Sequence, residues 1–309
     1  MTIITEEMRY RHKLCEYALK HGVTKTARRY HTNRQFVYRQ LEKYDGTVRS
    51  LALRSRRPKS SPNAHSYEEL KLIKKMYKRN GTYGLAEVYV RCKTKGYSRS
   101  FGSMCRQIRN TGLIKTEIKR KSYTRYTGLD GKYPGDKVQI DIKYIPDSCI
   151  RFPTYGKRYY QITAIDEYTR KRVLKIVKEK STYESAVFLK TLETEFGFRI
   201  KTVQVDNGYE FVNDPEKTDK ITMFQEVANR LGIKIKRTRP YSPWQNGKVE
   251  RSHREDDRII YSRMVFTSER ELEETIKKHE RRYNSTAKYV LSFRSPNEML
   301  EKYNLQKAS

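Results

Sequence analysis

Hydrophobic residues alternate with polar ones in two short segments of the second half of the chain. Residues 138–143 read VQIDIK, and residues 203–206 read VQVD and are followed by a turn-forming Asn-Gly pair. A period of two predicts β-strands with one packed face, and the turn pair predicts that the second strand ends there. Each strand therefore carries an aspartate, Asp141 or Asp206, opposite its apolar residues.

A polar segment farther along the chain has the start signals of a helix. Ser242 can cap the first turn, Pro243 suits the first helical position, and Gln245 completes the spacing of a capping box. Gly247 weakens such a start by about 1 kcal/mol relative to alanine, so the helix can also begin one or two residues after Gln245. Either start places Glu250 in the first turns.

Helical patterns fill the first part of the chain and form two groups of three. The first group has predicted helices at 6–20, 24–30 and 34–44, with Thr24 and Asn33 as caps. The second group has predicted helices at about 66–78, 83–93 and 100–110, the first opened by a capping box of Ser66 and Glu69. Both groups have the layout of a helix-turn-helix module.

The third helix of the first group has a buried face formed by Val37 and Leu41. Its other face carries four polar candidates for contacts with bases or phosphates in a major groove. These candidates are Arg34, Gln35, Tyr38 and Arg39. A solvated face without a DNA contact is the alternative.

The charge of the chain favours a polyanionic partner. It has 67 Lys and Arg against 36 Asp and Glu, a formal net charge of +31, and such an excess attracts nucleic acid with strong salt dependence. Residues 1–130 alone hold 31 basic and 10 acidic residues. The basic run 54–59, with Arg56 and Arg57, is either an exposed linker or an arm that lies in a minor groove.

These patterns predict six segments. We expect a helix-turn-helix module at 1–50, a basic linker at 51–65, a second such module at 66–114, a basic linker at 115–132, a catalytic core at 133–303 and a tail at 304–309. The four cysteines lack the paired spacing of a zinc site or a disulfide framework. Since the sequence has no membrane-spanning stretch or secretory signal, we expect a cytoplasmic protein associated with the nucleoid.

Two strand aspartates and a helical glutamate suit phosphodiester chemistry. Two divalent cations roughly 4 Å apart can clamp the attacking and departing oxygens, and magnesium prefers oxygen ligands. A single aspartate on a strand is more often a solvated surface residue. The sequences around the three acids therefore decide how each is interpreted.

Those surroundings resemble the DDE family of bacterial insertion-sequence transposases and retroviral-type integrases. The resemblance rests on Asp141, on the Asp206-Asn207-Gly208 turn, on PYSPWQNGKVERSHR at 240–254, and on the segments at 159–173 and 281–300. It covers about residues 130–303 and is most specific at NGKVER. It implies an α/β RNase H-like core, with a five-stranded mixed sheet and flanking helices.

The resemblance also implies a reaction. Asp141, Asp206 and Glu250 would be the catalytic residues and would hold Mg²⁺, with Mn²⁺ as a possible substitute. The enzyme would hydrolyse the end of a mobile element to free a 3′ hydroxyl and join it to target DNA. Its partners would be double-stranded DNA, as terminal repeats and as target, and further copies of the chain in a DNA-bound oligomer.

The chain departs from the family pattern at three points. The 43 residues between Asp206 and Glu250 exceed the usual spacing, and the excess falls in a polar stretch where a surface loop is tolerated. The sequence has no His-His-Cys-Cys zinc module and no small C-terminal barrel. These two absences favour the layout of a bacterial transposase.

Charged residues around the glutamate give further candidates. Lys248, Arg251 and Arg254 are predicted DNA contacts, and Arg254 could instead orient Glu250. His253 could help to activate water, contact a phosphate or pack. Asp166 and Glu167 compete as metal ligands, but their place at a strand end favours a role in a hairpin. 

Two other function classes stay open. An RNase H-type nuclease would use the same acids for hydrolysis alone, and a domesticated regulator would bind DNA without catalysis.

Overall fold

The computed structural model describes residues 4–53, 58, 61–114, 131–213, 218–239 and 242–308. It divides into two compact units, Met1–Ala64 and His65–Ser309. Each unit is described by itself. Arg56 and Arg57, and most of the second predicted linker, lie outside the described residues. The boundaries of the six predicted segments stay predictions.

The first unit is a three-helix group, as its sequence predicts. Its helices are α1 (Glu6–His21), α2 (Val23–Arg29) and α3 (Arg34–Leu41), followed by a 3-10 turn at Val48–Leu51. Leu14, Val37 and Leu51 meet in its core. Asn33 caps α3 as predicted, because its side chain accepts a hydrogen bond from Phe36 N at 2.7 Å.

Two details of this unit correct the sequence prediction. Thr24 is not a cap, because α2 already begins at Val23 and Gly22 takes the capping position. Gly22 has φ of 81°, a left-handed conformation that glycine adopts without a steric penalty. The third helix ends at Leu41, three residues before the predicted end.

The second unit begins with the other three predicted helices. They are α4 (Tyr67–Asn80), α5 (Leu85–Lys93) and α6 (Phe101–Asn110). The capping box of Ser66 and Glu69 is confirmed, and Ser100 caps α6. The second helix begins at Leu85 instead of residue 83, because a 3-10 turn and Gly84 precede it.

A five-stranded mixed sheet follows. Its strands are β1 (Val138–Tyr144), β2 (Tyr160–Asp166), β3 (Arg172–Val177), β4 (Thr202–Val205) and β5 (Lys234–Arg237). Their order is β3-β2-β1-β4-β5. The β1–β2 and β2–β3 pairs are antiparallel, while β1–β4 and β4–β5 are parallel. The predicted fold class, a mixed sheet with flanking helices behind all-α elements, is confirmed.

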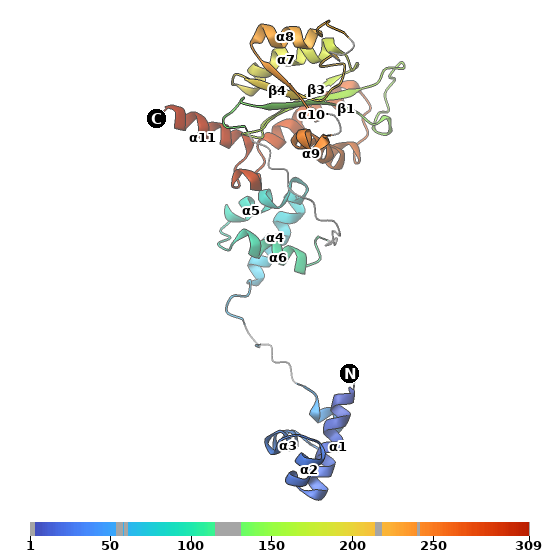
Figure 1. Cartoon of the computed structure of the whole chain (residues 1–309), viewed down its shortest axis with the longest axis vertical. Coiled ribbons are helices and arrows are strands. Elements are labelled where there is room, and N and C mark those ends of the chain that lie inside the picture. Colours follow the sequence, from blue (N-terminus) through green and yellow to red (C-terminus); the bar gives the residue numbers. More distant parts are fainter. Residues whose placement is uncertain are drawn as a thin grey trace. The chain divides into compact units, whose positions relative to one another are not determined.

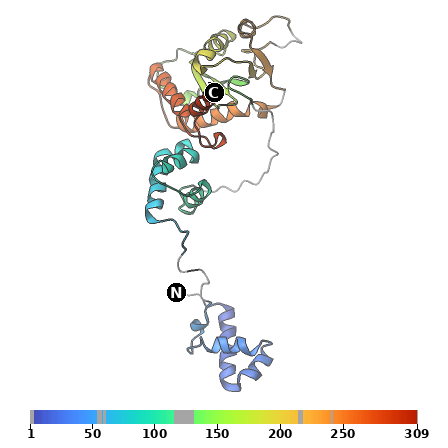
Figure 2. The same ribbon diagram turned by 90° about the vertical axis from the view of Figure 1, so that its left-hand side faces the viewer.

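Helices cover both faces of this sheet (Figure 1 and Figure 2). The helices after β3 are α7 (Thr182–Phe196), α8 (Met223–Leu231), α9 (Gly247–Asp256), α10 (Glu269–Asn284) and α11 (Pro296–Ala308). Figure 1 shows α7 and α8 on one face and α9 and α10 on the other. The larger apolar core joins α7 and α8 to the sheet, and a second core packs α10 and the π-helical turn Asp257–Tyr261 against the opposite face.

No helix in the described part of the chain combines the length and the apolar character needed to cross a membrane.

Candidate active site

The two predicted strand aspartates lie at the same edge of the sheet. In the parallel β1–β4 pair, Gln139 is in register with Gln204. Asp141 lies two residues beyond Gln139, and Asp206 lies two residues beyond Gln204, directly after β4 ends at Val205. Because parallel strands run in the same direction, the two carboxylates point from the same face at neighbouring positions.

Local hydrogen bonds orient both carboxylates. Asp141 Oδ1 accepts from Ile142 N at 2.8 Å, and Asp206 Oδ1 accepts from Gly208 N at 3.0 Å. In the latter turn, Asn207 Nδ2 donates to Thr238 O at 3.1 Å and ties the turn to the end of β5. The Asn-Gly pair thus ends the strand as predicted and also fixes the aspartate.

The glutamate lies on α9, but this helix starts differently from the predicted capping box. Pro243–Asn246 forms a 3-10 turn in which Ser242 makes no capping hydrogen bond, and α9 proper begins at Gly247. The side-chain oxygen of Gln245 accepts from Arg239 N at 3.1 Å instead. Glu250 is the fourth residue of α9, within its first turns as expected.

Two buried glutamines replace the missing cap and attach this helix start to the sheet. Gln139 and Gln204 are only 1% and 2% exposed. Both donate to the carbonyl oxygen of Gln245, at 3.0 and 2.8 Å. Gln204 also donates to Asn246 Oδ1 at 3.0 Å, and Gln139 Oε1 accepts from Val249 N at 3.2 Å.

These hydrogen bonds join the two strands that carry the aspartates to the helix that carries Glu250. Each strand reads Gln-x-Asp, so the side chains that hold α9 are two residues from the candidate aspartates. The amide of Val249, directly before Glu250, is fixed by the strand that carries Asp141. Rigid elements joined by buried hydrogen bonds hold side chains with the precision that catalysis needs. Sequence reasoning gave the two glutamines no role.

The pKa of Asp141 indicates that the charges of the three acids act on one another. Burial, and then the negative charges of Asp206 and Glu250, raise the pKa of Asp141 to about 7. Such mutual repulsion arises when carboxylates share a site, and the charge of Lys180 opposes it. A cation at this position would relieve the repulsion.

Lys180 is a site residue that the sequence analysis missed. Its ammonium pairs with Glu210 Oε1 at 2.9 Å, and the charges of Asp206 and Asp141 also favour its protonated form. Glu210 is buried and its carboxylate packs against the Cα of Gly208. The only available signal was the position of Glu210 in the DNGYEF segment, four residues after Asp206.

His253 contacts the first aspartate from one turn beyond Glu250. Its Nδ1 lies 3.5 Å from Asp141 Oδ2. Burial lowers the pKa of His253 to about 4, so at neutral pH the ring is uncharged and this contact is not an ion pair. An imidazole with so low a pKa is a weak proton acceptor.

The acidic cluster is a candidate cation site. Within the described residues, no group of three or more His, Cys, Asp or Glu side chains is arranged to hold a metal ion. Magnesium, however, usually takes one or two carboxylates and keeps several waters. The donor chemistry fits such an ion, because the oxygens of Asp141, Asp206 and Glu250 are hard ligands whose repulsion raises a carboxyl pKa.

The competing acids have structural partners. Asp166 is fully buried and accepts from Gly135 N, Thr169 N and the Thr169 hydroxyl at 2.7–3.0 Å. It therefore shapes the β2–β3 turn, in line with the hairpin role. Glu167 pairs with Lys137 at 2.9 Å and with Lys248 at 3.0 Å.

The predicted DNA contacts lie in different places. Arg251 and Arg254 are exposed on α9, while Lys248 is half-buried beside Glu167. On α3 of the first unit the predicted polar face is exposed, and it consists of Arg34, Gln35, Tyr38 and Arg39. Their contacts with DNA stay predictions.

Comparison with known proteins extends these observations. Two family models, both described as an integrase core domain, match residues 131–243 and 231–287. A curated relative named "Putative integrase ORF3", from Spiroplasma virus SpV1-C74, is 33% identical over 151 residues. That alignment covers 45% of this chain and 40% of the relative, so the chain spans about two fifths of the relative's length.

Distant likenesses exist among solved structures. The catalytic core domain of BIV integrase is 17% identical with a TM-score of 0.42, and the match covers 57% of this chain and 99% of that one. The HTLV-2 integrase catalytic core domain in complex with magnesium is 16% identical with a TM-score of 0.42, covering 55% and 99%. The assignment rests on the family models, whose matches together span residues 131–287 and contain all three acids. This chain belongs to the DDE-type transposase and integrase family.

Proposed function

We propose that this chain is a DNA transposase, a polynucleotidyl transferase that cuts the ends of a mobile element and joins them to target DNA. The observation that carries the proposal is the convergence of Asp141, Asp206 and Glu250. Two of them follow equivalent positions on paired strands, and the charges of two raise the pKa of the third. The family membership supports the same reaction class.

The reaction has two steps, and in each of them an oxygen nucleophile attacks a phosphorus and a 3′ oxygen leaves. In the first, a water oxygen attacks a phosphorus at the element's end, the bond to the 3′ oxygen breaks, and that oxygen leaves as a 3′ hydroxyl. The water's other proton passes to solvent. In the second, this 3′ hydroxyl attacks a phosphorus of the target, and a target 3′ hydroxyl leaves.

Asp141, Asp206 and Glu250 would hold Mg²⁺, or Mn²⁺ in its place, at this edge of the sheet. When bound, these ions supply Lewis acidity that stabilises the charge on the attacking and departing oxygens. The chain's own residues set the geometry. Gln139 and Gln204 fix the start of α9, and Lys180 balances part of the negative charge beside the aspartates.

The remainder of the chain would bind DNA. The exposed face of α3, with Arg34, Gln35, Tyr38 and Arg39, would read the terminal repeats. Arg56, Arg57, Lys248, Arg251 and Arg254 would contact phosphates. Because two element ends must be joined together, at least two copies of the chain would act in one DNA-bound assembly.

A strand-transfer assay tests this function. Full-length protein and Mg²⁺ would be incubated with labelled DNA that carries the flanking ends of the protein's own locus and with supercoiled target. Joined products from the wild type but not from Glu250→Gln support the proposal. Cleavage without joining would indicate a nuclease, and specific binding without either would indicate a regulator.

A further inference from the structure

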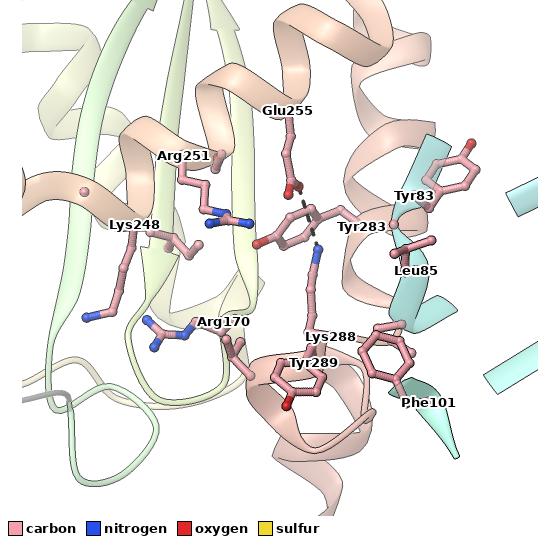
Figure 3. A pocket seen from close by; sticks show the side chains of 17 residues that line it. Tyr83, Leu85, Phe101, Arg170, Lys248, Arg251, Glu255, Tyr283, Lys288 and Tyr289 are labelled. Carbon is pink, nitrogen blue, oxygen red and sulfur yellow. Dashed lines mark ion pairs between the residues drawn. The ribbon is translucent and has the colours of Figure 1, made fainter. Parts of the chain in front are cut away.

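A cavity separate from the acidic site lies in the second unit, between α5, α6, α9 and the segment 283–290. Its volume is about 500 Å³, within the range of pockets that bind small ligands, about 300–1,000 Å³. Figure 3 shows it from close by. The site described above uses none of its space.

The cavity lies on another face of α9 from the acids. Lys248, Arg251 and Glu255 line it at intervals of three and four residues, which place side chains on one face of a helix. His253 instead contacts Asp141, on the side of the acidic site. The two sites are therefore separated by a single helix, whose diameter with side chains is about 10 Å.

The lining is cationic. Arg170, Lys248, Arg251 and Lys288 line the cavity together with one carboxylate, that of Glu255. Figure 3 shows Arg170, Lys248 and Arg251 on one side of the cavity, and the ammonium of Lys288 directed toward Glu255. Burial lowers the pKa of Lys288 to about 8, although Glu255 lies 3.8 Å away. An anion in the cavity would stabilise the charged form of this lysine.

An aromatic platform stands beside these charges. Tyr289 is 65% exposed, and one face of its ring stacks on Phe101, with centroids 5.3 Å apart and planes 23° from parallel. Phe293 supports Tyr289 edge-on at 5.5 Å. An exposed ring held by two others is a preformed surface for a flat, aromatic group.

Hydrogen bonds hold the two walls of the cavity together. The buried carboxylate of Glu87, on α5, accepts from Ala287 N at 2.9 Å and lies 3.5 Å from Arg282. Arg258 donates to Thr82 O at 2.7 Å. The cavity is thus built from both the α4–α6 group and the integrase core.

A nucleotide combines the two properties that this lining would recognise, an anionic phosphate and a flat base. A base inside a duplex is stacked on its neighbours and cannot lie on a protein ring, whereas an unpaired base can. We propose that the cavity binds an unpaired nucleotide of the DNA strand next to the cutting site, with its base on Tyr289 and its phosphate between Arg170 and Arg251. The DNA substrate in this inference rests on the proposed function.

Binding of model DNA to the full-length protein, without divalent metal, tests the inference. The probes are a short blunt duplex and the same duplex with a single-stranded extension of a few nucleotides. The extended duplex should bind the wild type more tightly, by roughly 5-fold to 150-fold, as expected for one stacked base. Abasic residues throughout the extension should remove that advantage, in an experiment that alters no residue of the protein.

Variants locate the effect. Tyr289→Ala should lose the advantage of the extension, and Tyr289→Phe should keep it, because stacking needs the ring and not the hydroxyl. Arg251→Gln, a change at an exposed position, should also reduce it. Tyr67→Ala is the matched control, because Tyr67 is 74% exposed on α4 and does not line the cavity.

Three results would overturn the inference: equal binding of the two duplexes, an advantage that survives abasic substitution, or an advantage that survives both Tyr289→Ala and Arg251→Gln. None of these depends on catalysis. A preference for the extension with no cleavage or joining would therefore keep the cavity assignment and reject the transposase, and the reverse pattern would do the opposite.

Discussion

Replacing Gln139 with methionine should slow DNA cleavage far more than it weakens DNA binding. The substitution keeps the length and volume of the side chain but removes its hydrogen bonds. Val249 N would lose its acceptor, and Gln245 O would keep only its bond from Gln204. A buried donor left without a partner costs roughly 1–3 kcal/mol, so the free energy of unfolding should fall by about that amount.

The larger effect of Gln139→Met should be on the position of Glu250. Without Gln139, the strand that carries Asp141 no longer fixes the backbone directly before Glu250. A displacement of about 1 Å at a catalytic group can lower a rate by roughly 100-fold. We therefore expect the single-turnover rate of cleavage to fall by about that factor, with little change in the dissociation constant for end DNA. Gln139→Glu should be no better, because it places a second carboxylate beside Glu167.

Urea unfolding, DNA binding and single-turnover cleavage would be measured on the same preparations. Gln225→Met is the matched control, because Gln225 belongs to the capping box of α8 and contributes to stability without a contact to α9. It should lose about 1 kcal/mol of stability and keep its cleavage rate. If Gln139→Met loses stability but its folded fraction cleaves at the wild-type rate, the glutamine does not position Glu250.

Three further predictions concern charges. Folding raises the pKa of Asp141 from 3.8 to about 7, so the ionised carboxylate destabilises the folded protein above pH 7. Asp141→Asn should therefore raise the free energy of unfolding above pH 7 by at most about 4 kcal/mol. This gain should vanish below pH 3.8, where the carboxyl group is protonated in both the folded and the unfolded state. A gain that does not depend on pH in urea unfolding would contradict this. Lys180→Met should shift the acid limb of the pH–rate profile of cleavage upward, because it removes a charge that lowers the pKa of Asp141; an unshifted profile would separate Lys180 from the site. Arg34→Ala combined with Arg39→Ala should reduce the slope of log K against log salt by about 2 in titrations with end DNA, and an unchanged slope would remove α3 from the phosphate contacts.

The sequence predicted what local patterns determine. Alternation located β1 and β4, and the caps Asn33 and Ser66 located two helix starts, because each depends on residues close together in the chain. The capping roles of Thr24 and Ser242 were wrong. A side chain caps only where the backbone turns at that residue, and in this chain Gly22 and a 3-10 turn move the helix starts.

Long-range contacts explain what the sequence did not predict. Gln139 looked like a polar residue on an exposed strand face, but it is buried because α9, more than one hundred residues later, covers that face. Lys180 joins the site through Glu210, 30 residues away. The three acids themselves were found because their motifs are distinctive, although nothing local indicates that their charges converge.

The strand-transfer reaction is the most direct test of the proposed function. Wild type and Glu250→Gln would be compared with Mg²⁺, labelled end DNA and supercoiled target, after equal binding of the end DNA has been established for both. We predict joined products from the wild type and none from Glu250→Gln. Joining by the Glu250→Gln protein at the wild-type level would contradict the assignment of Asp141, Asp206 and Glu250 as one catalytic site.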